Sequence, residues 1–235
     1  MESDEFKKPF DSKEILKLTE TTYDAIADKF TPLLSIKNAS VEELNAVDSF
    51  IDRLPNKSTI ADLGCGVGKH GRYCAQKGFT VYGFDISSNM IKLAERYNCK
   101  EDFAEMKVLQ IAEMSDFACE QKFDGVISAY AFIHLTYEQA EMALKNLHKH
   151  LNDHALIFIT VYKGKRNNIY KEILAPEYKL YFRDYEETDF KELITKCGYN
   201  IIDYKEWSDL DPITASNGNY DEKVLCIIGE YKKMT

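Results

Sequence analysis

One stretch of sequence decides the fold of this chain: Ile60-Ala61-Asp62-Leu63-Gly64-Cys65-Gly66-Val67-Gly68-Lys69-His70-Gly71. It begins as a short apolar run typical of a buried strand, passes through a turn rich in glycine, and then enters a helix. Gly64 and Gly66 allow the backbone to turn tightly and to approach a ligand, because a Cβ atom would obstruct both. The first amides of the helix are free and lie at the positive end of its dipole. The stretch therefore predicts a strand, a ligand-binding turn and a helix in succession.

The rest of the chain alternates short β-rich runs with amphipathic helices. The expected strands are residues 58–63, 80–84, 106–112, 123–130 and 154–162, and the expected helices are residues 69–77, 87–97 and 136–151. Such alternation implies right-handed crossovers and a parallel sheet with helices on both faces. A helix at 187–197 is followed by strands at 199–207 and 223–231, which are most easily antiparallel because no helix joins them. We predict an α/β fold with a seven-stranded, mostly parallel sheet whose last strand is antiparallel.

Two further amphipathic helices are expected before the sheet, at residues 13–30 and 41–54. No internal repeat and no linker rich in proline or glycine divides the sequence, so we predict one folding unit. Within it, we expect an N-terminal helical lid over residues 1–55 and a ligand-binding domain over residues 56–235, with a cap-like connection at 163–185.

The composition excludes several classes of protein. The 235 residues carry 30 Lys and Arg against 39 Asp and Glu, a net charge of −9, which disfavours binding to a nucleic acid backbone. No apolar run is long enough to span a membrane, and the acidic first residues lack the pattern of a signal peptide. The six cysteines form no CxxC pair and are expected to be reduced. We expect a cytoplasmic monomer or homodimer with no membrane or nucleic acid partner.

A second motif, Gly83-Phe84-Asp85-Ile86-Ser87, ends the next expected strand. A carboxylate at that point can accept hydrogen bonds from both hydroxyls of a ribose, although Asp85 can also serve only the cap of the following helix. The dinucleotide pattern Gly-x-Gly-x-x-Gly is not met, because Lys69 stands at the third glycine position. Asp62 would repel a pyrophosphate and suits an ammonium group. The two motifs together predict a nucleoside ligand without phosphates.

Several segments together resemble the class I S-adenosylmethionine-dependent methyltransferases. They are Asp62–Gly68, Gly83–Ser87, Phe123–Ser128, Tyr23–Ala27, Ala131–Leu135 and Tyr185–Gly198, and they extend over most of the chain. The resemblance implies a Rossmann-like fold, S-adenosylmethionine as cofactor and S-adenosylhomocysteine as product. These motifs are specific for the cofactor and say almost nothing about the methyl acceptor.

The resemblance also implies where the cofactor is held. The loop from Gly64 through Cys65 to Gly66 lies against the methionine portion through its backbone, and Asp85 holds the ribose. The other residues expected around the cofactor are Tyr23, Asp62, Ile86, Met90, Ala112, Glu113, Ala129 and Tyr130. Of these, Ile86 and Met90 pack on the adenine, and Ala129 and Tyr130 line the sulfonium end. The contact to the adenine amino group stays open between the Ala112 backbone, Glu113 and no side chain.

Methyl transfer needs the acceptor atom aligned about 3–3.5 Å from the methyl carbon, and a base only where the acceptor loses a proton. His134 is the candidate base, because it follows the fourth strand at the edge where open α/β sheets bind ligands. Tyr130 is the second candidate catalytic residue, and either residue can instead be structural. No metal site is expected, since His148, His150 and His154 belong to a solvated helix end.

Two groups of side chains can face the acceptor. The basic run Lys163–Arg166 can meet a carboxylate or phosphate, or it can be a solvated loop. An aromatic group can wall a pocket or pack within an appended lid, and its members are Tyr178, Tyr181, Phe182 and Tyr185.

The leading hypothesis is an enzyme that transfers a methyl group to oxygen or nitrogen of a small molecule by in-line displacement. The acidic net charge of −9 favours a small acceptor over a nucleic acid. The alternatives are a methyltransferase acting on protein or RNA and a non-catalytic, regulatory protein that binds S-adenosylmethionine.

Overall fold

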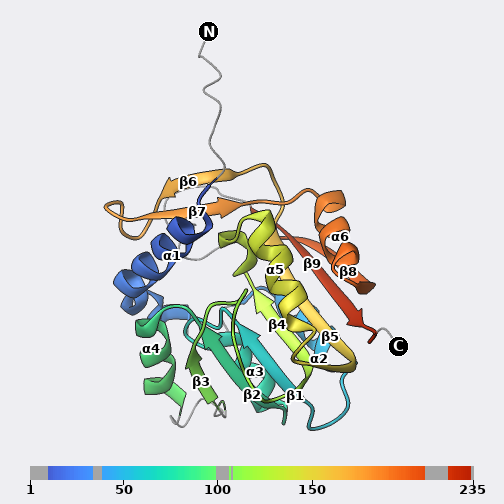
Figure 1. Cartoon of the computed structure of the whole chain (residues 1–235). Helices are drawn as coiled ribbons and strands as arrows, with labels where there is room; N and C mark the ends of the chain where they lie inside the picture. The colour runs from blue at the N-terminus through green and yellow to red at the C-terminus, as the bar shows by residue number, and fades with distance from the viewer. Residues whose placement is uncertain (1–9, 34–38, 99–105, 107, 210–221, 234–235) are drawn as a thin grey trace.

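The computed structural model describes residues 10–33, 39–98, 106, 108–209 and 222–233. Its main sheet has seven strands in the order β3-β2-β1-β4-β5-β9-β8 (Figure 1). The bounds are β1 Thr59–Leu63, β2 Thr80–Asp85, β3 Val108–Ile111, β4 Phe123–Ala129, β5 Leu151–Tyr162, β8 Tyr199–Asp209 and β9 Glu222–Tyr231. Strands β1 to β5 pair in parallel, and β9 lies antiparallel between β5 and β8. The predicted α/β fold and its antiparallel last strand are confirmed.

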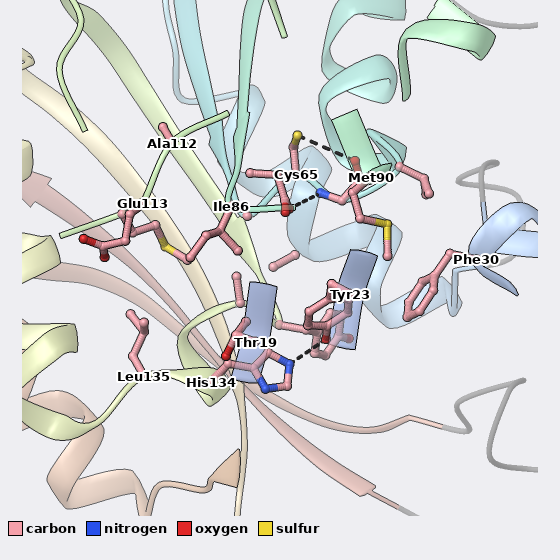
Figure 2. Close-up of a pocket in the computed structure, with 18 of the residues that line it drawn as sticks. Thr19, Tyr23, Phe30, Cys65, Ile86, Met90, Ala112, Glu113, His134 and Leu135 are labelled. Carbon is pink, nitrogen blue, oxygen red and sulfur yellow. Dashed lines mark hydrogen bonds between the residues drawn. The ribbon is translucent and has the colours of Figure 1, made fainter. Parts of the chain in front are cut away.

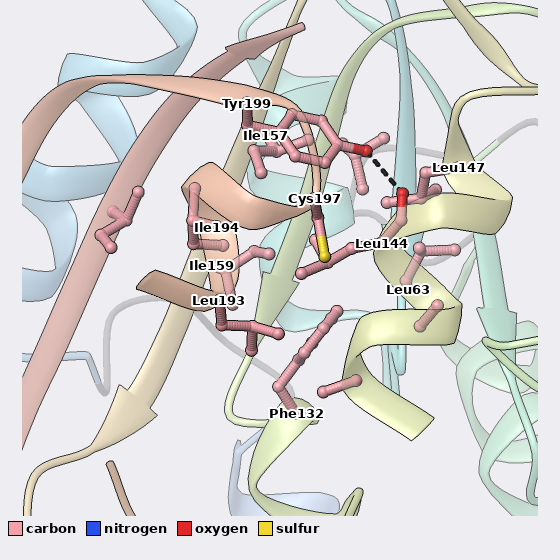
Figure 3. Packing of buried hydrophobic residues seen from close by; sticks show 14 of the residues in the cluster. Leu63, Phe132, Leu144, Leu147, Ile157, Ile159, Leu193, Ile194, Cys197 and Tyr199 are labelled. Carbon is pink, nitrogen blue, oxygen red and sulfur yellow. Dashed lines mark hydrogen bonds between the residues drawn. The ribbon is translucent and has the colours of Figure 1, made fainter. Parts of the chain in front are cut away.

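Helices cover both faces of this sheet. Helices α2 (Val41–Ile51) and α3 (Lys69–Gln76) contribute to the apolar cluster on one face, and α5 (Tyr137–Leu147) and α6 (Glu187–Lys196) contribute to the cluster on the other. Because side chains alternate along a strand, β5 serves both clusters. Ile157 and Ile159 pack under α5 and α6 (Figure 3), while Phe158 packs against Phe50 of α2 with ring centroids 5.6 Å apart.

The N-terminal helix α1 (Ser12–Ile26) and the 3-10 segment η1 (Ala27–Leu33) lie beyond the carboxyl ends of the parallel strands (Figure 1). Helix α1 packs against β7 (Lys179–Arg183) and against α4 (Ser88–Asn98). Strand β7 forms a separate antiparallel hairpin with β6 (Asn167–Lys171). The sequence predicted a connection here without strands. The assignment of residues 1–55 to a lid stays a prediction, and α2 lies on the sheet rather than beside α1.

The segment between α5 and β5 differs from the prediction. Helix α5 ends at Leu147 and β5 begins at Leu151, which pairs with Phe123 of β4. His150 is therefore buried, and its Nδ1 lies 3.0 Å from the Cys119 carbonyl oxygen. The ring of His148 stacks on Tyr231 at 4.7 Å. The expectation that all three histidines are solvated was wrong for His148 and His150, because β5 already begins at Leu151. Only His154, three residues further on, is exposed among the three.

No helix among the described residues is both long and apolar enough to cross a membrane. Within the same residues, no group of three or more His, Cys, Asp or Glu side chains has an arrangement that would hold a metal ion.

Candidate functional site

A cavity of about 200 Å³ lies between the carboxyl ends of β1, β2 and β4 and helix α1 (Figure 2). This is the edge at which open α/β sheets bind ligands. Its lining consists of Leu16, Thr19, Tyr23, Phe30, Gly64, Cys65, Gly66, Val67, Lys69, His70, Asp85, Ile86, Met90, Ala112, Glu113, Met114, Ala129, Tyr130, Ala131, His134 and Leu135. Every residue that the sequence proposed for the site is among them except Asp62.

The glycine turn forms the floor of the cavity. Gly64 and Gly66 both have left-handed backbone conformations, with φ of 67° and 51°. A Cβ atom on Gly64 would lie 2.3 Å from Cβ of Ala131, whereas one on Gly66 would meet no atom within 4 Å. Gly64 therefore allows β1 to pack closely against the segment after β4, and Gly66 leaves open space for a ligand against bare backbone.

Asp85 connects this turn to the start of the next helix. Its Oδ2 accepts a hydrogen bond from the Gly66 amide at 2.8 Å, and its Oδ1 accepts one from the Ser87 amide at 2.8 Å. Burial raises the pKa of Asp85 to about 6, although the two amide donors oppose this shift. Each carboxylate oxygen can accept a further hydrogen bond. Asp85 therefore takes part in the local backbone structure and keeps acceptor capacity toward the cavity.

Asp62 lies behind the turn and outside the cavity lining. Its Oδ2 accepts a hydrogen bond from the Gly71 amide at 2.9 Å, which ties β1 to helix α3. Burial is the main cause that raises the pKa of Asp62 to about 7, and the charge of Asp85 adds to it. The contact of Asp62 with an ammonium group stays a prediction, because this carboxylate reaches backbone rather than cavity.

The cavity lining includes apolar side chains that suit a flat ring. They include Ile86, Met90 and Phe30, and Figure 2 shows Phe30 close to Met90 and Tyr23. The Glu113 carboxylate is held by the Ser115 amide and hydroxyl at 2.6–2.7 Å, and Figure 2 shows its side chain directed away from the other labelled residues. The Glu113 side chain was one of the alternatives for a contact to the adenine amino group. In the structure its carboxylate instead accepts hydrogen bonds from Ser115 within the same turn.

The two candidate catalytic residues, Tyr130 and His134, also belong to the cavity lining. Tyr130 adopts a left-handed backbone conformation with φ of 58°, which is uncommon for a residue with a side chain and is frequent at functional sites. Its ring packs on Tyr162 at 5.5 Å. His134 lies deeper and is 5% exposed. Both residues line the cavity, and their catalytic roles stay predictions.

His134 is held by two partners that fix its tautomer. Its Nδ1 lies 3.0 Å from the carbonyl oxygen of Tyr181, which can only accept, so Nδ1 carries the hydrogen. Nε2 is then an acceptor, and the hydroxyl of Tyr23 donates to it at 2.6 Å (Figure 2). Burial lowers the pKa of His134 to about 4, so the ring is neutral near pH 7.

Sequence reasoning missed several lining residues. Leu16 and Thr19 precede Tyr23 at helical spacing on α1, and this periodicity was the available signal. Lys69 and His70 share one oxygen of the buried Glu43, at 2.9 and 2.5 Å. Burial favours a raised pKa for Glu43, but the hydrogen bond from His70 and the charge of Lys69 lower this pKa to about 2. No local motif reveals that cluster, since Glu43 belongs to α2.

The two groups expected near the acceptor have other roles. Lys163 pairs with Glu206 at 2.8 Å, and Arg166 pairs with Asp184 and Glu222 at 2.9 Å each. The charges of Lys163 and Arg166 are therefore compensated by Asp184 after β7 and by carboxylates of β8 and β9. Among the four aromatic residues, Tyr181 and Tyr185 are each 1% exposed, and none of the four belongs to the cavity lining.

Known proteins support a methyltransferase interpretation of this site. Residues 60–154 match the family model described as a methyltransferase domain. The chain is 27% identical over 183 residues to phosphoethanolamine N-methyltransferase of Plasmodium falciparum, covering 74% of this chain and 65% of the relative. It is 31% identical over 88 residues to a dTDP-3-amino-3,6-dideoxy-alpha-D-glucopyranose N,N-dimethyltransferase of Streptomyces fradiae, covering 37% of this chain and 32% of that enzyme. The chain thus spans less than two thirds of both relatives.

The fold has close counterparts among solved structures. The Burkholderia thailandensis 1,6-didemethyltoxoflavin-N1-methyltransferase, solved with 1,6-didemethyltoxoflavin and S-adenosylhomocysteine, superposes with a TM-score of 0.71 at 16% identity. The superposition covers 96% of this chain and 92% of that chain. The open space at Gly66 and the acceptor capacity of Asp85 fit the nucleoside and amino acid parts of S-adenosylmethionine. The methyltransferase domain match over residues 60–154, the sheet order and the glycine loop together support a class I S-adenosylmethionine-dependent methyltransferase.

Proposed function

We propose that this chain transfers a methyl group from S-adenosylmethionine to oxygen or nitrogen of a small molecule by in-line displacement. The observation that carries the proposal is the Tyr23–His134 hydrogen bond of 2.6 Å, because both residues line the cavity together with Tyr130. A neutral, oriented histidine beside a hydroxyl is suited to take a proton from an acceptor. When bound, the cofactor supplies an electrophilic methyl group on a sulfonium sulfur.

Different residues of the cavity lining would bind different parts of the cofactor. Asp85 would hold the ribose hydroxyls, and the backbone of Gly64 to Gly66 would lie against the methionine portion. Ile86 and Met90 would pack on the adenine. Because these contacts come from two strand ends and one helix start, they would fix the direction of the cofactor across the sheet edge.

Tyr23 and His134 would accept the proton that the methyl acceptor loses. An acceptor N–H or O–H donates to the Tyr23 oxygen, and the Tyr23 proton moves to Nε2 of His134 as the new bond to carbon forms. The acceptor thereby loses one proton, and His134 becomes an imidazolium whose Nδ1–H still faces the Tyr181 carbonyl oxygen. That carbonyl favours the charged ring, which partly offsets its burial.

The position of the cavity supports a small acceptor rather than a polymer. Helix α1 contributes Leu16, Thr19 and Tyr23 to its lining, so the acceptor end lies beneath a helix. The net charge of −9 disfavours RNA. The two curated relatives carry the names of N-methyltransferases of small molecules. The structural counterpart was solved with the small molecule 1,6-didemethyltoxoflavin bound.

Location and assembly stay predictions. The described cysteines, Cys65, Cys74, Cys119, Cys197 and Cys226, are all unpaired with one another. This is consistent with the reducing cytoplasm that we propose as the location. We propose a monomer or a homodimer, and the molar mass measured by light scattering distinguishes the two.

The test is release of S-adenosylhomocysteine from S-adenosylmethionine in the presence of separate panels of amines, phenols and carboxylic acids. We expect turnover with a member of one panel, and loss of that turnover in Asp85→Ala, which also weakens S-adenosylhomocysteine binding several-fold because charge-assisted hydrogen bonds are lost. Labelled methyl found only on protein or RNA would contradict the proposal. Tight cofactor binding without any turnover would favour the regulatory alternative.

A further inference from the structure

Asp24 of α1 caps a different helix. Its Oδ1 accepts hydrogen bonds from the Ser87 hydroxyl at 2.6 Å and from the Asn89 amide at 2.9 Å. The Asn89 side-chain amide returns a hydrogen bond to the Asp24 carbonyl oxygen at 2.9 Å. Free amides at a helix N-terminus are usually satisfied by a residue next to it in sequence. In α4 the Met90 amide donates to the neighbouring Ser87 hydroxyl, but the Asn89 amide donates to a carboxylate on a helix more than 60 residues away.

The capped segment is continuous with the proposed ribose site. Ser87 is fully buried, its amide donates to Asp85 Oδ1 at 2.8 Å, and its hydroxyl accepts from the Met90 amide at 3.1 Å. The Ser87 hydroxyl therefore has one proton, which goes to Asp24, and its amide faces Asp85. Two hydrogen bonds of Ser87, one to Asp85 and one to Asp24, therefore join the carboxylate at the cavity to helix α1.

The residue before Asp24 reaches the opposite half of the cavity. Tyr23 donates to His134, which lies after β4, while Asp24 accepts from the start of α4 after β2. Consecutive residues of a helix point in directions about 100° apart, so one short segment of α1 can contact both halves at once. Because a helix moves as a unit, a displacement that breaks one contact strains the other.

We propose that Asp24 is a positioning residue that couples occupation of the ribose site to closure of α1 over the acceptor half of the cavity. The coupling rests on the proposed function, because it assigns the ribose to Asp85. A ribose held by Asp85 fixes the Asp85–Ser87 pair, and the fixed Ser87 hydroxyl holds Asp24 and, with it, Tyr23 against His134. The coupling is reciprocal, so closed α1 also slows departure of the nucleoside.

The first test compares Asp24→Asn and Asp24→Ala with Asp28→Asn. Asp28 is an exposed residue of the adjoining segment η1, and its substitution removes the same charge without touching the cap. Hydrogen exchange of the α1 amides is followed with and without S-adenosylhomocysteine. We expect the ligand to slow α1 exchange in the wild type and in Asp28→Asn, and to leave it unchanged in both Asp24 variants. Dissociation of S-adenosylhomocysteine is expected to be about fivefold faster in those variants, which corresponds to loss of a helix cap of about 1 kcal/mol.

The second test uses the wild type and therefore does not depend on folding of a variant. Adenosine, which has both ribose hydroxyls, should slow α1 exchange, whereas 2′,3′-dideoxyadenosine and homocysteine should not. Equal protection of α1 by adenosine and dideoxyadenosine would overturn the coupling, as would full protection in Asp24→Asn. Failure of the wild type to bind S-adenosylhomocysteine at all is a distinct result that contradicts the proposed function instead.

Discussion

Asp85 is a single buried carboxyl group whose ionisation should be visible in cofactor binding. Its pKa is raised to about 6, so below pH 6 it is mostly protonated and accepts ribose hydrogen bonds poorly. We expect affinity for S-adenosylhomocysteine, measured by calorimetry, to rise about tenfold between pH 5 and pH 7 as the carboxylate forms. Asp85→Asn should bind more weakly and show no such slope. A slope retained in Asp85→Asn would assign the titration to Asp62 or another group.

Tyr23 and His134 are expected to act as one unit in turnover. Removing the hydroxyl in Tyr23→Phe or the ring in His134→Ala should lower kcat by tenfold or more for an acceptor that must lose a proton. Affinity for S-adenosylhomocysteine should fall less than in Asp85→Ala, because neither Tyr23 nor His134 holds the ribose. The double variant should be no slower than the slower single variant. Additive losses in the double variant would show independent roles.

Helix α5 begins at a capping box directly after His134 and Leu135. The Thr136 hydroxyl accepts from the Gln139 amide at 3.2 Å, and the Gln139 side chain accepts from the Thr136 amide at 2.9 Å. Thr136→Ala should lower the free energy of unfolding in urea by about 1 kcal/mol. Thr195→Ala on α6 is the matched control, because that hydroxyl contacts only carbonyls of its own helix at an exposed site. An equally large decrease in the free energy of unfolding in Thr195→Ala would contradict a stabilising contribution of the cap.

The elements show where sequence reasoning succeeded and where it could not. Each strand of the parallel sheet was predicted because its apolar run and the following helix are local patterns. Hairpin β6–β7 was missed, since its burial pattern is mostly exposed in β6 and its stability comes from packing against α1. At the site, Gly64 and Asp85 were predicted from spacing alone. The contact between Tyr23 and His134 joins residues 111 positions apart and has no local signature.

At the scale of the whole molecule, buried Asp62 should make stability depend on pH. Its pKa in the folded chain is raised to about 7 from 3.8, so the folded state holds a proton that the unfolded state releases. This contribution to stability is fully present below about pH 4 and is lost as pH rises through 7. Asp62→Asn cannot ionise, so its unfolding free energy in urea relative to the wild type should increase from pH 5 to pH 8. A constant difference across that range would contradict the raised pKa.

The place of β9 in the sheet has a consequence for synthesis of the chain. Strands β5 and β8 leave the ribosome before β9, the strand that joins them, has been made. Until residues 222–231 emerge, β5 keeps an open edge of unpaired backbone groups, and such edges can pair with another chain. Strands β1, β2 and β4, which carry the cofactor loop, have no such dependence and can assemble during translation. The nascent protein is therefore most exposed to aggregation after its binding pocket has formed and before its last strand has been inserted.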